Sequence, residues 1–138
     1  MEEDEEEAEI SVYLEKVKVE NPKISTAGCV SYTLSGYDKV GQYNNIEKRY
    51  RDFYVLHEWL TQRYQGLYIP EIPQKKAIGN REFKFIEERR FLLQEFLMNL
   101  TKHKYLWTSD EYTAWVRTSS AQDLVANLKD KTRRQLKA

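Results

Sequence analysis

Apolar and polar residues alternate in the first third of the chain, which is the period of a β-strand. The alternation runs from Ile10 to Leu14 and resumes with the opposite parity at Val17 and Val19. This pattern predicts one strand with a bulge near residues 15–16.

A turn and two further strands follow in the sequence. Residues 21–23 (asparagine, proline and lysine) predict the turn, and the alternation over residues 29–34 predicts a second strand. A loop over residues 36–41 leads to a third strand over residues 42–50. Three strands joined by short turns favour an antiparallel meander.

From Asp52 onward the spacing of apolar residues lengthens to three or four. Asp52 can cap a helix whose apolar positions continue to Tyr64, and Gly66 ends it. Two prolines in residues 68–73 enforce an extended path. An apolar stripe then predicts a long helix over residues 82–100.

Two helices are predicted in the remainder of the chain. Thr108 and Glu111 fit a capping box for a short helix that carries Trp115. A final amphipathic helix over residues 119–138 reaches Ala138 without a glycine or proline stop. It resembles a linker, and we expect the chain to be cut from a longer protein.

The length and composition fit a single soluble domain. The chain has 138 residues, of which 41% are apolar and 32% charged. No apolar run approaches the roughly 20 residues that span a bilayer, so membrane contact would be peripheral. Cys29 is the only cysteine, which excludes an internal disulfide and fits a reducing cytosol.

The formal net charge of zero conceals two oppositely charged parts. Residues 1–9 contain seven acids and no base, so the rest of the chain has 22 basic and 22 − 7 = 15 acidic residues, a surplus of +7. We expect residues 1–8 to be a disordered acidic tail. The basic remainder predicts a partner rich in phosphate, either nucleic acid or an anionic membrane.

Three basic stretches could hold such a partner. The first surrounds Arg49 and Tyr50. The planar guanidinium of Arg49 is suited to binding a phosphate, and the ring of Tyr50 can stack on a sugar-like ring. The alternative is that Arg49 pairs with a nearby carboxylate while Tyr50 packs in the core. The second stretch is Lys75–Lys76, at the end of a proline-stiffened loop. The third is Arg89–Arg90, which lies beside the apolar stripe of the long helix. An arginine at such a partly buried position needs a partner for its charge. Glu87 and Glu88 face Arg89 poorly, because they are only one or two residues away.

These three stretches resemble the motifs of the PX (phox homology) domain, especially that of sorting nexins. The resemblance runs from about Glu9 to Val116. It rests on the strings Lys48-Arg49-Tyr50-Arg51-Asp52-Phe53, Ile69-Pro70-Glu71-Ile72-Pro73-Gln74-Lys75 and Phe85-Ile86-Glu87-Glu88-Arg89-Arg90. It implies an α+β fold over residues 9–118, a three-stranded antiparallel β-sheet packed against a helical subdomain with a proline-rich loop.

The resemblance also implies roles for individual side chains. Arg49 would hold the 3-phosphate of phosphatidylinositol 3-phosphate, and Tyr50 would stack under the inositol ring. Lys75 would approach the 1-phosphate, and Arg89 would hydrogen-bond the 4- and 5-hydroxyls. The implied function is recognition of this lipid by a cytoplasmic protein that is peripheral on endosomal membranes, in sorting-nexin-like trafficking.

Supporting residues complete the expected site. Lys48 and Lys76 would support the phosphate-binding residues, with Arg51 and Arg90 supporting or structural. Ile78 is the one strong apolar residue of the short segment 74–84, so we expect it to contact the membrane. The burial of this side chain supplies only roughly 1.5–3 kcal/mol, so membrane docking of the single domain should be weak and salt-sensitive. Stable docking should need a dimer or a second module, for example through a downstream region.

Other functions remain as alternatives at this point. The string Pro70-Glu71-Ile72-Pro73 could be read by an SH3 domain, and a PX-like domain could serve as a protein-interaction module with weak or altered lipid specificity. Nucleic-acid binding is disfavoured because the bases are not interleaved with the aromatics. His57 and His103 have no visible metal-ligand or triad partner, so no enzyme activity, metal or cofactor is expected.

The charged ends carry two further hypotheses. The acidic tail could fold over the basic pocket and compete with lipid. The basic end of the final helix, from Lys129 to Lys137, could lie on a membrane surface, although packing on the domain or a linker role is the simpler interpretation.

Overall fold

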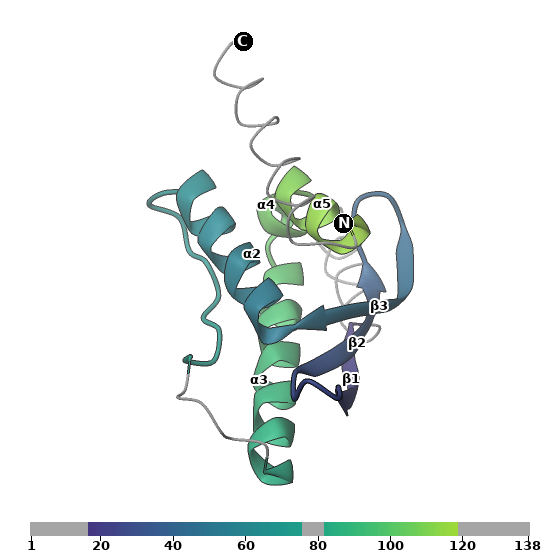
Figure 1. Cartoon of the computed structure of the whole chain (residues 1–138). Helices are drawn as coiled ribbons and strands as arrows, with labels where there is room; N and C mark the ends of the chain where they lie inside the picture. The colour runs from purple at the N-terminus through teal and green to yellow at the C-terminus, as the bar shows by residue number, and fades with distance from the viewer. Residues whose placement is uncertain (1–16, 76–81, 119–138) are drawn as a thin grey trace.

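The computed structural model describes residues 17–75 and 82–118. Three strands form one sheet in the order β1 (Lys18–Ile24), β2 (Val30–Tyr37) and β3 (Gln42–Arg49) (Figure 1). Both strand pairs are antiparallel, so the predicted meander and the α+β class are confirmed.

The predicted turn at residues 21–23 is wrong, because these residues lie inside β1. The register of β1 with β2 shifts between Glu20 and Lys23, where the proline has no N–H for the ladder. One extra residue is therefore accommodated as a β-bulge. The chain reverses instead at residues 25–29, where the N–H of Ser25 donates to the carbonyl of Cys29.

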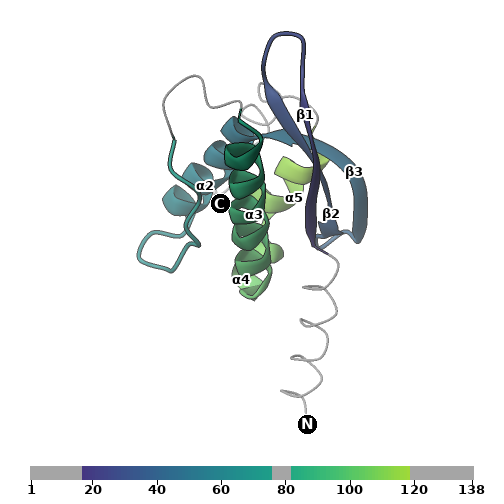
Figure 2. The same ribbon diagram turned by 90° about the horizontal axis from the view of Figure 1, so that it is seen from below.

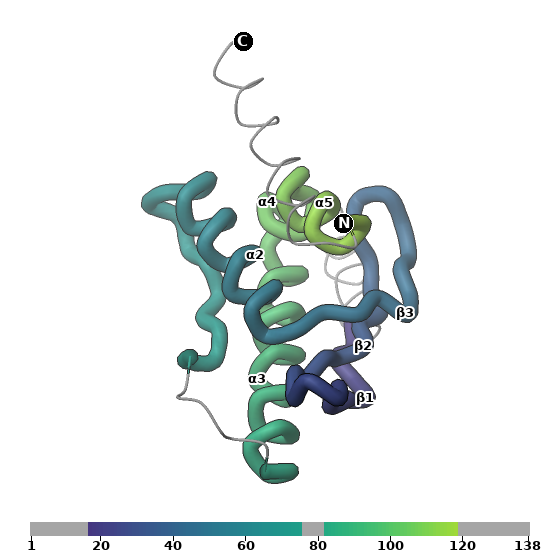
Figure 3. Tube along the Cα trace, viewed as in Figure 1, coloured from purple at the N-terminus to yellow at the C-terminus, as the bar shows by residue number. Residues whose placement is uncertain are grey.

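Four helices follow the sheet in the described residues: α2 (Tyr50–Arg63), α3 (Phe83–Thr101), α4 (Lys104–Trp107) and α5 (Asp110–Arg117). Figure 2 shows α3 in the middle, with the sheet on one side and α2 on the other. The chain after α2, residues 64–75, returns along the outside of this helix toward the beginning of α3 (Figure 3). Its last part, residues 69–75, is the proline-rich segment. The predicted long helix is confirmed to within one residue at each end.

Two predicted helix caps are displaced. α2 begins at Tyr50, so Asp52 is its third residue, and the Asp52 carboxylate accepts a hydrogen bond from the Arg49 N–H at 2.7 Å. α5 is capped by Ser109, whose hydroxyl accepts from the Tyr112 N–H at 3.1 Å, while Thr108 bonds back to a carbonyl of α4. In both places the side chain that accepts the hydrogen bond satisfies an otherwise unpaired N–H of the first turn.

The core lies between the sheet and the helices. The ring of Phe53 on α2 meets Trp115 of α5 and Phe96 of α3, with centroids 5.1 and 6.4 Å apart. All three side chains are buried, and each contributes about 1.5–3 kcal/mol to stability. The same packing fixes where α2 starts relative to α3, which sets the distance between the first and third basic stretches.

Several predictions lie outside the described residues. They concern the acidic tail 1–8, the strand over residues 10–16, Lys76, Ile78 and the helix over residues 119–138. Within residues 17–75 and 82–118, none of the helices has both the length and the apolar character that crossing a bilayer requires.

Candidate functional site

The corner between β3 and α2 positions Arg49. This residue ends the strand, and the bond from its N–H to Asp52 holds the backbone of the corner. Its half-buried side chain reaches across to the neighbouring hairpin, where Nη1 donates to Cys29 Sγ at 3.4 Å. Because sulfur is a weak acceptor, most of the donor capacity of this guanidinium remains for a stronger anion.

Tyr50, the first residue of α2, links three parts of the fold. Its hydroxyl donates to the carbonyl of Pro73 in the proline-rich segment. Burial raises the pKa of Tyr50, with the nearby Arg89 acting in the opposite direction, so the phenol stays neutral and keeps this hydrogen bond. Tyr50 is therefore fixed between the sheet, the segment and α3.

Arg89 is held between two aromatic rings. Its Cζ lies 4.0 Å from the ring centroid of Tyr50 and 4.7 Å from that of Phe85, one turn earlier on α3. Its Nη2 donates to the carbonyl of Gln74 at 3.3 Å. These two ring contacts and the hydrogen bond orient the guanidinium before any ligand binds, and a guanidinium has further N–H donors beyond the one used here.

Two other basic residues of the three stretches, Arg90 and Lys48, stabilise the fold. Arg90 pairs with Glu87 through Nε and Oε2 at 3.1 Å and donates to the carbonyl of Val19, which ties α3 to β1. Lys48 is buried, donates to the carbonyl of Thr118 and lies over the ring of Trp115. The prediction that Lys48 supports the phosphate-binding residues therefore needs correction: adjacent strand residues face opposite sides, and Lys48 faces the core.

The ion pairs of the described residues do not involve the candidate site. This finding covers residues 17–75 and 82–118, where no Asp or Glu forms an ion pair with Arg49, Lys75 or Arg89. Lys75 is exposed at the end of the proline-rich segment, and its Nζ lies 5.7 Å from the ring centroid of Tyr54. Three cations are thus available on neighbouring elements, while Arg90 and Lys48 are used to hold the fold.

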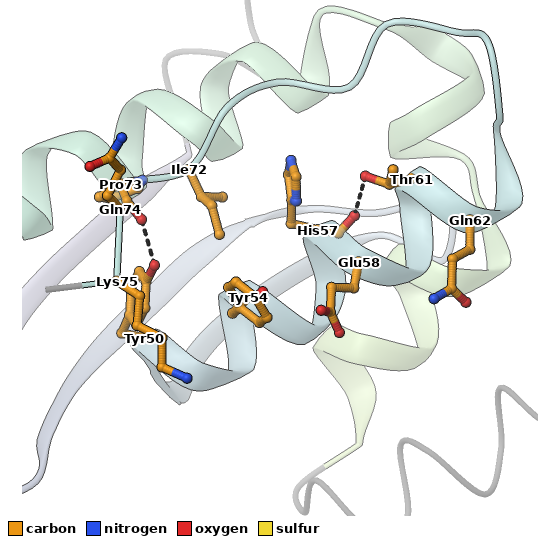
Figure 4. A pocket seen from close by; sticks show the side chains of 10 residues that line it. All are labelled: Tyr50, Tyr54, His57, Glu58, Thr61, Gln62, Ile72, Pro73, Gln74 and Lys75. Carbon is orange, nitrogen blue, oxygen red and sulfur yellow. Dashed lines mark hydrogen bonds between the residues drawn. The ribbon is translucent and has the colours of Figure 1, made fainter.

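Two hollows adjoin this cluster. A small one of about 60 Å³ lies between the end of the proline-rich segment and α3, and Arg89 and Phe85 line it. A larger one of about 490 Å³ lies between α2 and the same segment, on the other side of Tyr50 (Figure 4). The sequence reasoning identified Arg49, Tyr50 and Arg89 but missed the role of Phe85, although its four-residue spacing from Arg89 was a visible signal.

The geometry argues against recognition of the proline-rich string by an SH3 domain. Pro70 is buried, so the string Pro70-Glu71-Ile72-Pro73 cannot present both prolines to an SH3 domain. In the described part of the chain, no three acidic, histidine or cysteine side chains gather where they could hold a metal ion.

A small antiparallel sheet beside a helical subdomain, with arginine side chains near their junction, is an arrangement suited to an anionic ligand. A family model described as PX domain matches residues 38–117, more than half of the chain. The chain therefore belongs to the PX domain family, a family of modules that bind phosphoinositides and membranes.

Comparisons with individual proteins agree with this assignment. Vacuolar protein sorting-associated protein 5 of Saccharomyces cerevisiae is 30% identical over 102 residues, which are 70% of this chain and 15% of that protein. The vps5 protein of Schizosaccharomyces pombe is 33% identical over 92 residues (66% and 16%), and sorting nexin 1 of Arabidopsis thaliana is 31% identical over 94 residues (64% and 23%). The chain thus spans less than a quarter of the length of each of these relatives.

A solved structure has the same fold. An X-ray structure of a designed CISK-PX domain superposes with a TM-score of 0.65 and 25% sequence identity, covering 75% of this chain and 99% of that chain. The predicted PX fold, a three-stranded sheet followed by helices, is confirmed.

Proposed function

We propose that the chain recognises the head group of phosphatidylinositol 3-phosphate at the cluster of Arg49, Tyr50, Lys75 and Arg89. The observation that carries this proposal is the contact of Arg89 with the ring of Tyr50, the residue that follows Arg49, together with the lack of a described carboxylate that pairs with either guanidinium. A pre-oriented cationic site that lacks an internal partner is suited to an external anion.

Each side chain has a separate role in this proposal. Arg49 holds the 3-phosphate with its planar fork of donors, and Tyr50 lies under the inositol ring. Arg89 donates to the 4- and 5-hydroxyls, so that a phosphate at either position clashes with the fixed guanidinium. Lys75 reaches the 1-phosphate by rotating away from Tyr54, which its exposed, flexible stem permits.

The proposal extends to membrane docking and location. The names of the relatives, sorting nexin and vacuolar protein sorting, support a role in protein trafficking at endosomal membranes for a cytoplasmic, peripheral protein. Lys76 and Ile78, which lie outside the described residues, would add a basic and an apolar contact with the leaflet. Because one isoleucine contributes only about 1.5–3 kcal/mol, a dimer or second module should strengthen docking.

Arg49→Gln provides the test of this function. We expect the wild-type chain to sediment with liposomes that contain phosphatidylinositol 3-phosphate, in preference to the other phosphoinositide isomers. Removing two charge-assisted hydrogen bonds at about 1.5–3 kcal/mol each should reduce this binding more than tenfold. The fold should persist, because Arg49 contacts only Cys29 through its described side-chain hydrogen bond.

Arg51→Gln is the matched control, since Arg51 is exposed two residues further on and should keep near-normal binding. Normal sedimentation of the Arg49→Gln chain, or equal loss in the Arg51→Gln chain, would contradict the proposed site. A panel in which all anionic lipids bind equally would contradict the proposed specificity.

A further inference from the structure

The larger hollow lies beside the proposed phosphate site and shares Tyr50 and Lys75 with it. Its volume is about 490 Å³, and it runs between the exposed side of α2 and the proline-rich segment 69–75 (Figure 4). Neither Arg49 nor Arg89 lines it. The hydrogen bond from Tyr50 to the carbonyl of Pro73 closes the end of the groove toward Arg89, so the two sites share a wall.

We propose that this groove binds a short, extended peptide of a partner protein. The peptide places an acidic side chain near Lys75, an apolar side chain over Tyr54 and Ile72, and a basic side chain near Glu58. The peptide and the head group would both use Lys75, whereas Tyr54, Glu58 and Ile72 line the groove and have no part in the proposed lipid site.

The middle of the groove suits an apolar side chain. Tyr54 is 38% exposed, and Ile72 packs against the core while one side of it lines the groove. His57 lies beside them, further along α2 (Figure 4), and burial lowers its pKa, so its imidazole adds no full charge at neutral pH. A carbon-lined hollow with polar groups at its ends is typical of a binding groove.

The two ends of the groove carry opposite charges. Lys75 lies at one end with its Nζ 5.7 Å from the Tyr54 ring centroid, and Glu58 is exposed one helical turn beyond Tyr54. Neither residue forms an ion pair with another described residue. A second phospholipid head group would meet one cation and be repelled by Glu58, whereas a peptide with an acid and a base complements both ends.

The proline-rich wall offers groups that suit a peptide backbone. No N–H of residues 69–75 donates a hydrogen bond to another described residue. An extended peptide laid along this segment can pair with these donors, as peptides do at exposed strand edges. In an extended peptide, residues i, i+2 and i+4 face the same side about 6.6 Å apart, which matches the rise of about 6 Å along α2 from Tyr54 to Glu58.

The probe for this proposal is the acetylated, amidated peptide Glu-Ser-Leu-Ser-Lys, titrated into the ¹⁵N-labelled full chain. We expect saturable amide shifts concentrated in residues 54–62 of α2 and in residues 69–75. Replacing either the acid or the base of the peptide by glutamine should weaken binding about two- to five-fold, the range of an exposed ion pair.

Glu58→Lys gives the sharpest version of the experiment. This variant should weaken the Glu-Ser-Leu-Ser-Lys peptide and strengthen Glu-Ser-Leu-Ser-Glu, while Glu47→Lys, an exposed glutamate on β3, should change neither. Arg49→Gln should leave peptide binding intact, and Glu58→Lys should leave binding of soluble inositol 1,3-bisphosphate intact, so the two proposals fail separately.

Three outcomes would overturn the proposal. They are the absence of saturable shifts in the groove, an equal response to all charge variants of the peptide, and groove shifts caused by inositol 1,3-bisphosphate but not by the peptide. The last outcome would make the groove a second anion site.

Discussion

Adjacent arginines on α3 have different roles because their neighbours differ. Arg89 lies between the rings of Tyr50 and Phe85 and has no described carboxylate partner. Arg90 is neutralised by Glu87 and bonded to the carbonyl of Val19. One arginine is therefore available for a ligand, and the next holds the helix to the sheet.

Arg89→Lys should weaken head-group binding while the stability of the fold changes little. Lysine keeps the charge but loses the planar stacking between two rings, which is worth about 0.5–2 kcal/mol and corresponds to about a two- to thirty-fold weaker affinity. Calorimetric titration with inositol 1,3-bisphosphate measures this change.

Arg90→Lys is the control at the neighbouring position, and we expect it to change stability and not affinity. It should lower the urea midpoint, because the forked contact to Glu87 and Val19 is lost, and leave head-group affinity near normal. Equal effects of the two substitutions on affinity would remove the distinction between a ligand-binding and a structural arginine.

At the residue scale, the sequence was most informative where a charged side chain lacked a suitable partner among its neighbours in the sequence. Arg89 beside an apolar stripe required a partner, and this requirement predicted its place in a site. The motif places Lys48 beside Arg49 and did not decide between a supporting and a structural role for it, but strand alternation turns Lys48 toward the core. The cap at Ser109 was missed because Thr108 has the same chemistry one residue earlier.

At the scale of elements, an ion pair between a buried aspartate and an exposed arginine fastens the β2–β3 turn to α5. Arg117 donates to both carboxylate oxygens of Asp38 at 2.9 Å, and the Asp38 side chain is fully buried. The same carboxylate also accepts the N–H groups of Val40 and Gly41. The turn and the end of the chain's last described helix therefore depend on one aspartate.

Asp38→Ala should destabilise the fold by about 2–3 kcal/mol, because two backbone N–H donors and a guanidinium lose their acceptor. The estimate is reduced for Arg117, which is 38% exposed and can rehydrate. Lys39→Ala, which breaks the exposed pair with Asp110, should cost less than about 1 kcal/mol. Urea unfolding of both variants tests the comparison, and equal losses would contradict it.

Elements with a long, regular period were predictable, and irregular ones were not. The apolar stripe of α3 located its ends to within one residue. In β1, Pro22 resembles a turn signal, but the cross-strand pairing with β2 continues past it through a bulge. That outcome depends on a partner strand that local sequence does not reveal.

At the scale of the whole molecule, α3 separates the sheet from α2 and the proline-rich segment (Figure 2). The candidate phosphate site forms where all of these parts meet. Its residues were predictable because three basic stretches occur in an ordered pattern along the chain. The groove beside α2 was not, because it arises only when the exposed side of a helix is placed opposite an extended segment.

His57 should make the stability of the whole fold depend on pH. Burial is the main cause that lowers its pKa from 6.5, with Glu58 and Glu71 acting in the opposite direction. The unfolded chain then binds a proton more readily than the folded chain, so stability falls as pH drops through about 6.5 toward the folded pKa. His57→Gln should reduce this fall between about pH 7 and 5.5, as measured by urea unfolding, and an unchanged slope would contradict the assignment.

The most direct test of the account asks whether Arg49 and Arg89 contact the same anion. Nε–Hε signals of the arginine side chains can be followed by NMR while inositol 1,3-bisphosphate is added to the full chain. The account predicts that the Arg49 and Arg89 signals shift together with one dissociation constant, while those of Arg51 and Arg117 remain in place. Shifts of only one of the two, different dissociation constants for them, or shifts spread over all arginines would contradict a single shared site.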